Sequence, residues 1–182
     1  MRPSYEVSFG TLKNRVEIIG DPQAQVLRPP RHDDETLGPS IFRLLLEDVD
    51  LAGLTLPGLH VGRSEMRRIS FGGSDLHMST FNWSDLIDCD FSGADLSGAD
   101  LRACSFVRCL FRGANLARSD LRGSNFEACV FDNAAMAGTT LYRRGRALGF
   151  FKVGTDQESL PLSAAQRAGI AWSAEAAEPG GG

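Results

Sequence analysis

Cysteine and histidine are the residues of this chain that could bind a metal ion or act as nucleophiles. The three histidines, His32, His60 and His77, lie far apart in the sequence, with no metal-ligand spacing. Each cysteine lies two residues before a phenylalanine, which predicts a buried thiol that packs as a small apolar side chain. These residues are Cys89, Cys104, Cys109 and Cys129. We therefore expect free, buried thiols and no metal site.

Sequence motifs that mark catalytic or cofactor sites are absent. There is no G-x-S-x-G nucleophile elbow, no P-loop and no G-x-G-x-x-G after a predicted strand. Residues 72–76 (GGSDL) resemble part of a calcium-binding nonapeptide, but the surrounding period is five residues rather than nine. The chain is therefore expected to have no enzymatic activity and no cofactor.

Aspartates are concentrated in one part of the chain that contains no lysine or arginine. We name this set the acidic belt, and its members are Asp75, Asp85, Asp88, Asp90, Asp95 and Asp100. Five arginines follow it, at positions 102, 108, 112, 118 and 122. Two interpretations are open: the carboxylates bond to the local backbone on a solvated face, or they form a surface for a basic partner. From residue 44 to 143, thirteen acidic residues outnumber nine arginines, so the net charge is −4.

These side chains are positioned by a hydrophobic pattern that repeats every five residues from Leu44 to Arg143. A period of five fits neither an α-helix face nor a β-strand face, whereas a coiling chain would keep such residues inside. The residue two positions earlier is small from Ser64 onward, except at Ile69. The central apolar residues are Leu46, Leu51, Leu56, Val61, Met66, Phe71, Leu76, Phe81, Leu86, Phe91, Leu96, Leu101, Phe106, Phe111, Leu116, Leu121, Phe126, Phe131, Met136 and Leu141.

Several units of this repeat have the form Ala/Ser-(Asp/Asn)-Leu-x-x. Residues 94–101 contain two tandem copies, and further copies begin at Ala114 and Ser119. The pattern resembles the pentapeptide-repeat family over about 100 of the 182 residues. The resemblance implies an all-β fold, a right-handed quadrilateral parallel β-helix (a solenoid) in which four units make one coil. Twenty units then predict about five coils.

Residues twenty positions apart should then stack on one side of the β-helix. One core column would contain Phe71, Phe91, Phe111 and Phe131. Two positions later, glycine or asparagine recurs, and both tolerate the left-handed backbone of a tight corner. Another column alternates in charge, and it contains Asp48, Arg68, Asp88 and Arg108. Three of the cysteines would share a column with parallel side chains, which is poor geometry for a disulfide.

The segments on either side of the repeat are expected to cover its ends. In residues 1–43, Ser4–Phe9 and Arg15–Ile19 predict a hairpin that caps the β-helix or packs on its side, followed by a proline-rich connector. Residues 44–143 form the repeat and 144–172 a C-terminal cap, in which Phe150 and Phe151 would pack on the last coil. Ser163 is expected to cap a short helix over Ala164–Ile170, with Trp172 as an apolar anchor. Residues 173–182 are expected to be disordered.

Composition predicts a soluble cytoplasmic protein. No stretch approaches 18 apolar residues, and the N-terminus lacks the apolar core of a signal peptide. The excess of arginine over lysine and the family resemblance favour a bacterial source. A pI near 5.4 and the lack of interleaved surface aromatic residues argue against direct nucleic-acid binding.

The family resemblance also implies a function. Some pentapeptide-repeat proteins imitate duplex DNA, bind DNA gyrase or topoisomerase IV and protect the enzyme from inhibitors, a form of antibiotic resistance. In this chain the acidic belt would then bind the enzyme, and the C-terminal segment would form a homodimer or cap its own chain. The alternative is an interaction module for a protein partner unrelated to DNA enzymes. That alternative is motivated by an outward apolar strip, covered by the N-terminal segment or free, whose members are Ile87, Val107, Leu110 and Val130.

Overall fold

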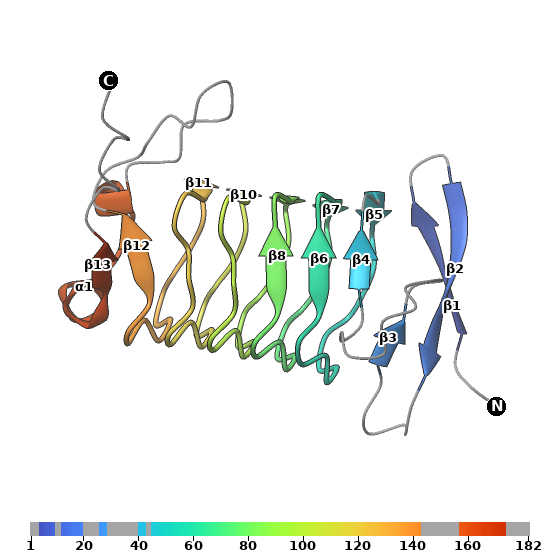
Figure 1. Ribbon diagram of the computed structural model, residues 1–182, viewed down its shortest axis with the longest axis horizontal. Coiled ribbons are helices and arrows are strands. Elements are labelled where there is room, and N and C mark those ends of the chain that lie inside the picture. Colours follow the sequence, from blue (N-terminus) through green and yellow to red (C-terminus); the bar gives the residue numbers. More distant parts are fainter. Residues whose placement is uncertain are drawn as a thin grey trace, which may run out of the picture.

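The computed structural model describes residues 4–9, 12–19, 26–28, 40–42, 45–142 and 157–173. Its main body is a parallel β-helix whose coils stack along one axis, with antiparallel strands at one end and a short helix at the other (Figure 1). Within the described residues, no helix combines the length and the apolar character that a bilayer span needs.

Two of the four sides of the β-helix are parallel sheets. The first side has one strand per coil, and its strands are β5 (Leu45–Glu47), β7 (Glu65–Arg67), β9 (Asp85–Ile87), β10 (Ser105–Val107) and β11 (Asn125–Glu127). The fourth side contains β4 (Ser40–Phe42), β6 (His60–Gly62), β8 (Thr80–Asn82) and, farther along the axis, β12 (Thr140–Tyr142). Each residue pairs with the one twenty positions later, as Leu86 does with Phe106. The first side spans five levels and four complete turns, which confirms the predicted fold class and stacking register.

The second and third sides are joined by single parallel bridges between coils. The bridged residues run from Asp50 to Val130 on the second side and from Thr55 to Ala135 on the third. Corners between sides have a left-handed backbone, as at Gly93, where φ is 67°. Glycine adopts this conformation without strain, so the predicted column of corner glycines follows from the geometry.

The core explains the five-residue period. From residue 59 to residue 141, each unit buries its central residue and the residue two positions before it, which is small except at Leu59 and Ile69. Most of the other side chains face outward. The Phe91 ring stacks between Phe71, at 4.9 Å between centroids, and Phe111, at 5.1 Å. Phe106 and Phe126 form a second stacked pair, and both meet Phe111 edge to face. Stacked aromatic rings therefore run along the axis, as the columns predict.

Buried hydroxyl groups two positions before the central residue donate hydrogen bonds to the preceding coil. Ser79 and Thr139 each donate to a carbonyl oxygen 23 residues earlier, that of Leu56 at 3.4 Å and of Leu116 at 2.6 Å. Ser124 donates in the same way to the Leu101 carbonyl oxygen. Serine and threonine are therefore accepted in this interior because their hydroxyl groups find backbone acceptors.

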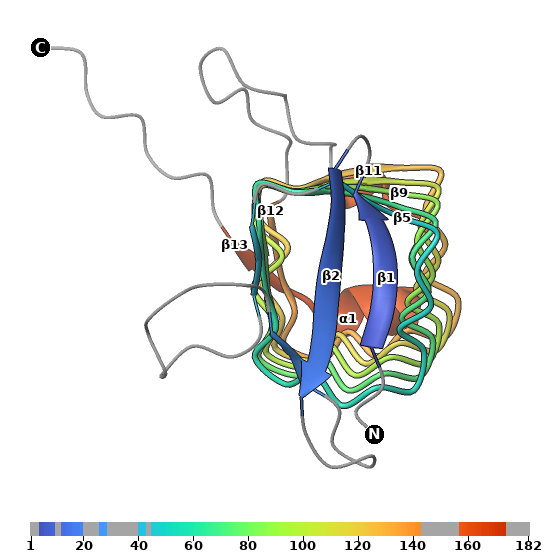
Figure 2. The same ribbon diagram turned by 90° about the vertical axis from the view of Figure 1, so that its right-hand side faces the viewer.

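The N-terminal strands lie across one end of the β-helix. β1 (Ser4–Phe9) and β2 (Leu12–Ile19) form an antiparallel pair where the sequence predicts a hairpin, although β2 begins three residues earlier than predicted. β3 (Val26–Arg28), within the predicted connector, pairs with β2. In Figure 2, β1 and β2 cross the end of the coil stack, and β1 lies next to β5. This arrangement covers a sheet end that would otherwise be exposed.

The first parallel strand, β4, lies before the predicted start of the repeat at residue 44. Its buried central residue, Ile41, pairs with Val61 and continues the five-residue series one unit toward the N-terminus. The repeat therefore extends into the segment that was predicted to be a connector.

The C-terminal segment packs on the last coil of its own chain. It consists of η1 (Gln157–Ser159), α1 (Ala164–Gly169) and β13 (Ala171–Ser173), and β13 pairs in parallel with β12. Ser163 caps α1 in a capping box with Gln166, and Trp172 packs against the core, which confirms both predictions for these residues. Ser173 lies in β13, although it was expected in the disordered tail. Phe150, Phe151 and residues 174–182 lie outside the described residues.

Two glutamine side chains complete this cap. The Gln157 Nε2 atom donates to the carbonyl oxygens of Leu121 and Ser124, at 2.8 and 3.2 Å. Gln166 Nε2 donates in the same way to the carbonyl oxygens of Phe131 and Ala134, at 2.7 and 3.1 Å. The carbonyls of Ser124 and Ala134 would each accept from the next coil if the repeat continued. The two side chains thus replace a further coil on two sides.

Candidate protein-binding surface

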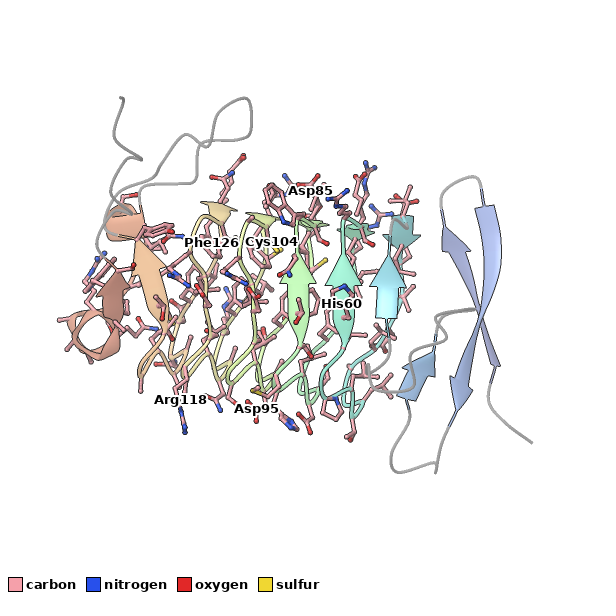
Figure 3. All side chains as sticks on the ribbon, in the orientation of Figure 1. His60, Asp85, Asp95, Cys104, Arg118 and Phe126 are labelled. Atoms are coloured by element: carbon pink, nitrogen blue, oxygen red, sulfur yellow. The ribbon has the colours of Figure 1, made fainter. Side chains whose placement is uncertain are left out.

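The acidic belt winds around the β-helix instead of lying along one side. Asp85, Asp90, Asp95 and Asp100 occupy the same position in four successive units, so each lies on a different side. Asp75 is bridged to Asp95 on the third side. Figure 3 shows Asp85 and Asp95 at opposite edges of the β-helix. Asp85, Asp90, Asp95 and Asp100 therefore present one carboxylate on each of the four sides within a single turn.

Two belt carboxylates are paired with arginine. Asp88 accepts two hydrogen bonds from Arg108 of the next coil, at 2.6 and 2.7 Å, and this guanidinium holds the pKa of Asp88 below its ordinary value. Asp100 accepts two from Arg102, at 2.8 and 2.7 Å, and these bonds likewise lower the pKa of Asp100. Both aspartates remain ionised at neutral pH, but their charge is largely compensated.

Three other belt carboxylates accept local hydrogen bonds. Asp90 accepts from the Ser92 backbone N–H at 2.8 Å, and Asp95 from the Ser97 N–H at 2.9 Å. Asp75 lies 2.6 Å from His77 Nδ1. No ion pair between an arginine and Asp75, Asp90 or Asp95 is present among the described residues. The local turn role and a role in partner binding are compatible, because a carboxylate that accepts one or two hydrogen bonds keeps further acceptor capacity.

The charged corner column forms the ion pairs that its alternating sequence predicts. Arg68 donates two hydrogen bonds to Asp48, at 2.5 and 2.7 Å, in the same geometry as the pair between Arg108 and Asp88. These four side chains are exposed or half-exposed, so the pairs favour the correct stacking register more than they stabilise the fold.

All four cysteines are buried free thiols, as predicted. The Cys104 side chain points into the interior, as Figure 3 shows, and contacts the Phe81 carbonyl oxygen. Burial raises the pKa of Cys104 to about 12. Thiols 20 residues apart lie in neighbouring coils, and the adjacent Cys129 and Cys89 thiols together with burial raise the pKa of Cys109. Cys104 and Cys109 therefore have little thiolate character at neutral pH, and all four cysteines are packing residues of the core.

A thiol-specific maleimide should therefore leave the folded protein unmodified. We expect no label at neutral pH in native buffer and four labels per chain after denaturation, counted by intact mass spectrometry. For Cys104 and Cys109, the raised pKa also makes labelling slow at mildly alkaline pH, because the reactive thiolate is scarce. Prompt labelling of the native protein would contradict the assignment of the cysteines to the core.

Metal-ligating residues are not brought together in the described residues, where no group of three His, Cys, Asp or Glu could hold a metal ion. His60 lies on the fourth side and His77 on the third.

The apolar strip of Ile87, Val107, Leu110 and Val130 is only half-exposed. β1 and β2 cross the end of the β-helix, where β1 lies next to β5 (Figure 2).

Two large apolar side chains on the surface were not predicted from the sequence. Among the described residues, Met78 and Trp83 are the large apolar side chains on the surface, 66% and 53% exposed. Each follows a core residue by two positions and occupies a corner, with φ of 58° and 56°. Their position in the repeat could have predicted this exposure, because a large side chain at a corner must point outward.

Comparisons with known proteins agree with this fold. Residues 64–102 and 104–143 match the family model for pentapeptide repeats, in eight copies. No curated protein sequence matches the chain. A pentapeptide repeat protein from the thylakoid lumen of Arabidopsis thaliana is 28% identical over 50% of this chain and 66% of its own, with a TM-score of 0.48.

Two further solved structures are similar to this chain. A trypsin-treated form of QnrB1, a plasmid-mediated fluoroquinolone resistance protein, is 18% identical over 50% of this chain and 59% of its own, with a TM-score of 0.36. HetL, a pentapeptide repeat protein of the cyanobacterium Nostoc involved in heterocyst differentiation regulation, is 15% identical over 60% of this chain and 66% of its own, with a TM-score of 0.28. The chain thus spans about two thirds or less of each of these structures. The repeats of residues 64–102 and 104–143, which form most of the coils described above, are thus similar to those of the pentapeptide-repeat family.

Proposed function

We propose that this protein is a non-catalytic DNA mimic that binds a type II topoisomerase, with DNA gyrase as the first candidate and topoisomerase IV as the second. Binding in place of DNA would protect the enzyme from inhibitors that act on its DNA complex. The observation that carries the proposal is the acidic belt, which places one carboxylate on each of four sides within one turn. Duplex DNA likewise presents negative charge all around its axis.

This geometry selects the shape of the partner. A flat surface touches one side of the β-helix and reaches few of the belt carboxylates. A concave basic surface, such as a saddle that holds DNA, reaches carboxylates on three sides at once. The belt therefore favours a partner that wraps a rod-shaped ligand.

The net charge of the whole repeat is too small to imitate DNA, so the proposed mimicry is restricted to the acidic belt. Five levels stacked about 4.8 Å apart make a rod of about 24 Å, and duplex DNA of that length carries about 14 charges. Residues 44–143 have a net charge of −4, because nine arginines offset thirteen acidic residues. The segment from Asp75 to Asp100 has six aspartates and no lysine or arginine, although Arg108 and Arg102 outside it offset the charges of Asp88 and Asp100.

Charge reversal tests the proposal. We expect the triple variant Asp85→Lys, Asp90→Lys, Asp95→Lys to fold normally and to lose binding to purified DNA gyrase by at least tenfold, measured by calorimetry. Each carboxylate would otherwise face a basic group of the partner, and the reversal replaces attraction with repulsion.

The matched control reverses three acidic residues outside the belt, as Asp50→Lys, Glu127→Lys and Asp132→Lys. It changes the net charge by the same amount and should bind the enzyme nearly as well as the wild type. Equal binding by the belt variant and the wild type would remove the belt from the interface, and equal losses in both variants would show a non-specific charge effect.

A second candidate is an interaction module whose partner is unrelated to DNA enzymes. The pairing of Asp88 and Asp100 with arginine and the exposure of Trp83 favour it, because both features suit a mixed surface more than a DNA-like one. This candidate predicts partner binding that changes little with salt. Dimerisation through the C-terminal segment stays a prediction, since residues 157–173 pack on their own chain.

A further inference from the structure

A groove lies on the fourth side of the β-helix, along the corner that leads to the first side. The corner column contains Trp83, then Ala103 and Gly123 in the next two coils. The two small residues leave a hollow of about 320 Å³ next to the large indole, and Tyr142 lines it farther along the axis. We name this hollow the Trp83 groove. Its volume is at the lower end of the range for ligand sites in proteins.

The two arginines in the floor of the groove are each paired with an aspartate. Arg102 is held by Asp100 at 2.7 and 2.8 Å and lies 3.7 Å from Asp120. Arg122 is held by Asp120 at 2.6 Å, and its guanidinium carbon lies 6.0 Å from the centre of the Tyr142 ring. Two arginines thus face two aspartates, so the floor has no excess positive charge to attract a phosphate group.

One polar atom in the groove lacks a partner. Asn82 lines the hollow, and its Oδ1 atom is buried with no hydrogen-bond partner among the described residues. A buried acceptor without a donor is destabilising, and a hydrogen bond from a ligand N–H would remove that cost. The groove therefore offers an aromatic wall, and Asn82 at its edge carries an unused acceptor.

Tryptophan, tyrosine and arginine are the residue types that dominate the binding energy of protein–protein interfaces. All three line this groove, and the belt flanks it, since Asp85 lies on the first side and Asp100 on the fourth. We propose that the Trp83 groove receives an aromatic side chain of the protein partner, and that Asn82 turns its buried, unpaired Oδ1 atom toward an adjoining amide N–H of that partner. This inference rests on the proposed protein-binding function and adds the anchor point to it.

The groove and the belt should affect binding differently. Exposed charges act mainly on the association rate and its salt dependence, whereas a buried anchor acts on the dissociation rate. With immobilised DNA gyrase, Trp83→Ala should speed dissociation at least tenfold and leave the salt dependence unchanged. Met78→Ala is the matched control, because Met78 is also an exposed apolar residue, lies at the corner just before that of Trp83 and does not line the groove. Equal dissociation rates for Trp83→Ala and the wild type would overturn the inference and leave the proposed function standing.

A second arm needs no partner enzyme. N-acetyl-L-phenylalaninamide, a neutral aromatic compound with amide donors, should shift the NMR signals of Asn82 and Tyr142 saturably in the full-length protein. These shifts should disappear in Trp83→Ala and persist in Met78→Ala. Saturable shifts without gyrase binding would support the groove and refute gyrase as the partner. No shifts, or shifts with adenosine monophosphate alone, would refute the groove as a site for an aromatic side chain.

Discussion

Replacing Phe91 with aspartate is expected to abolish cooperative folding of the β-helix. The ring is fully buried, stacked on Phe71 and Phe111, and meets Phe81 and Phe106 edge to face. Loss of a buried phenylalanine side chain costs about 3–5 kcal/mol, and an unpaired buried carboxylate adds several more. Together these losses approach the total stability of an ordinary domain, about 5–15 kcal/mol.

Thermal unfolding followed by circular dichroism measures this effect, with size-exclusion chromatography as a test of compactness. Ala135→Asp is the control, because it adds the same charge at an exposed position that carries Asp95 two coils earlier. We expect the control to melt within a few degrees of the wild type. A cooperative transition near the wild-type temperature in Phe91→Asp would contradict the stacking register.

Replacing Gln157 with glutamate is expected to destabilise the C-terminal cap by about 3–5 kcal/mol at neutral pH. The Gln157 side chain is 1% exposed, and its Nε2 atom satisfies two carbonyl oxygens of the last coil. Its Oε1 atom accepts from the Tyr142 N–H at 2.6 Å. A carboxylate keeps that acceptor, loses both donors and places a negative charge against the carbonyls of Leu121 and Ser124.

The pH dependence separates charge from packing in this variant. Burial among carbonyl oxygens raises the pKa of the introduced carboxyl group above the unfolded value of about 4.3. Folding then binds a proton, so the deficit is greatest at neutral pH and shrinks as the pH falls toward the unfolded pKa. Gln157→Met removes the donors without adding charge, and its deficit should not vary in this way. Chemical denaturation from pH 7 to pH 4 gives both curves, and parallel curves would contradict the buried position of Gln157.

The repeat core was predictable because its signal is local and periodic. The Phe91 column and the ion pair between Asp88 and Arg108 follow from counting twenty residues along the chain. Ser163 was predictable for a similar reason, since its capping box lies within four residues of sequence. A fold built from one repeated unit places residues by position alone.

The caps and the groove could not be predicted in the same way. Gln157 and Gln166 bond to carbonyls 32 to 36 residues earlier, a relation that depends on how a non-repeating segment packs. The Trp83 groove depends on two small residues in later coils and on Tyr142, about sixty residues away. The acidic belt is continuous in sequence but is distributed over four sides, because the chain turns a corner after every five residues.

Binding of the wild-type protein to DNA gyrase, with duplex DNA as a competitor, tests the central claim most directly. Surface plasmon resonance at two salt concentrations gives the affinity, its salt dependence and the effect of the competitor in one series. We predict binding that weakens with salt and that duplex DNA displaces, because the belt and DNA would occupy the same basic surface. Absence of binding at micromolar protein, or binding that duplex DNA does not displace, would contradict DNA mimicry at gyrase.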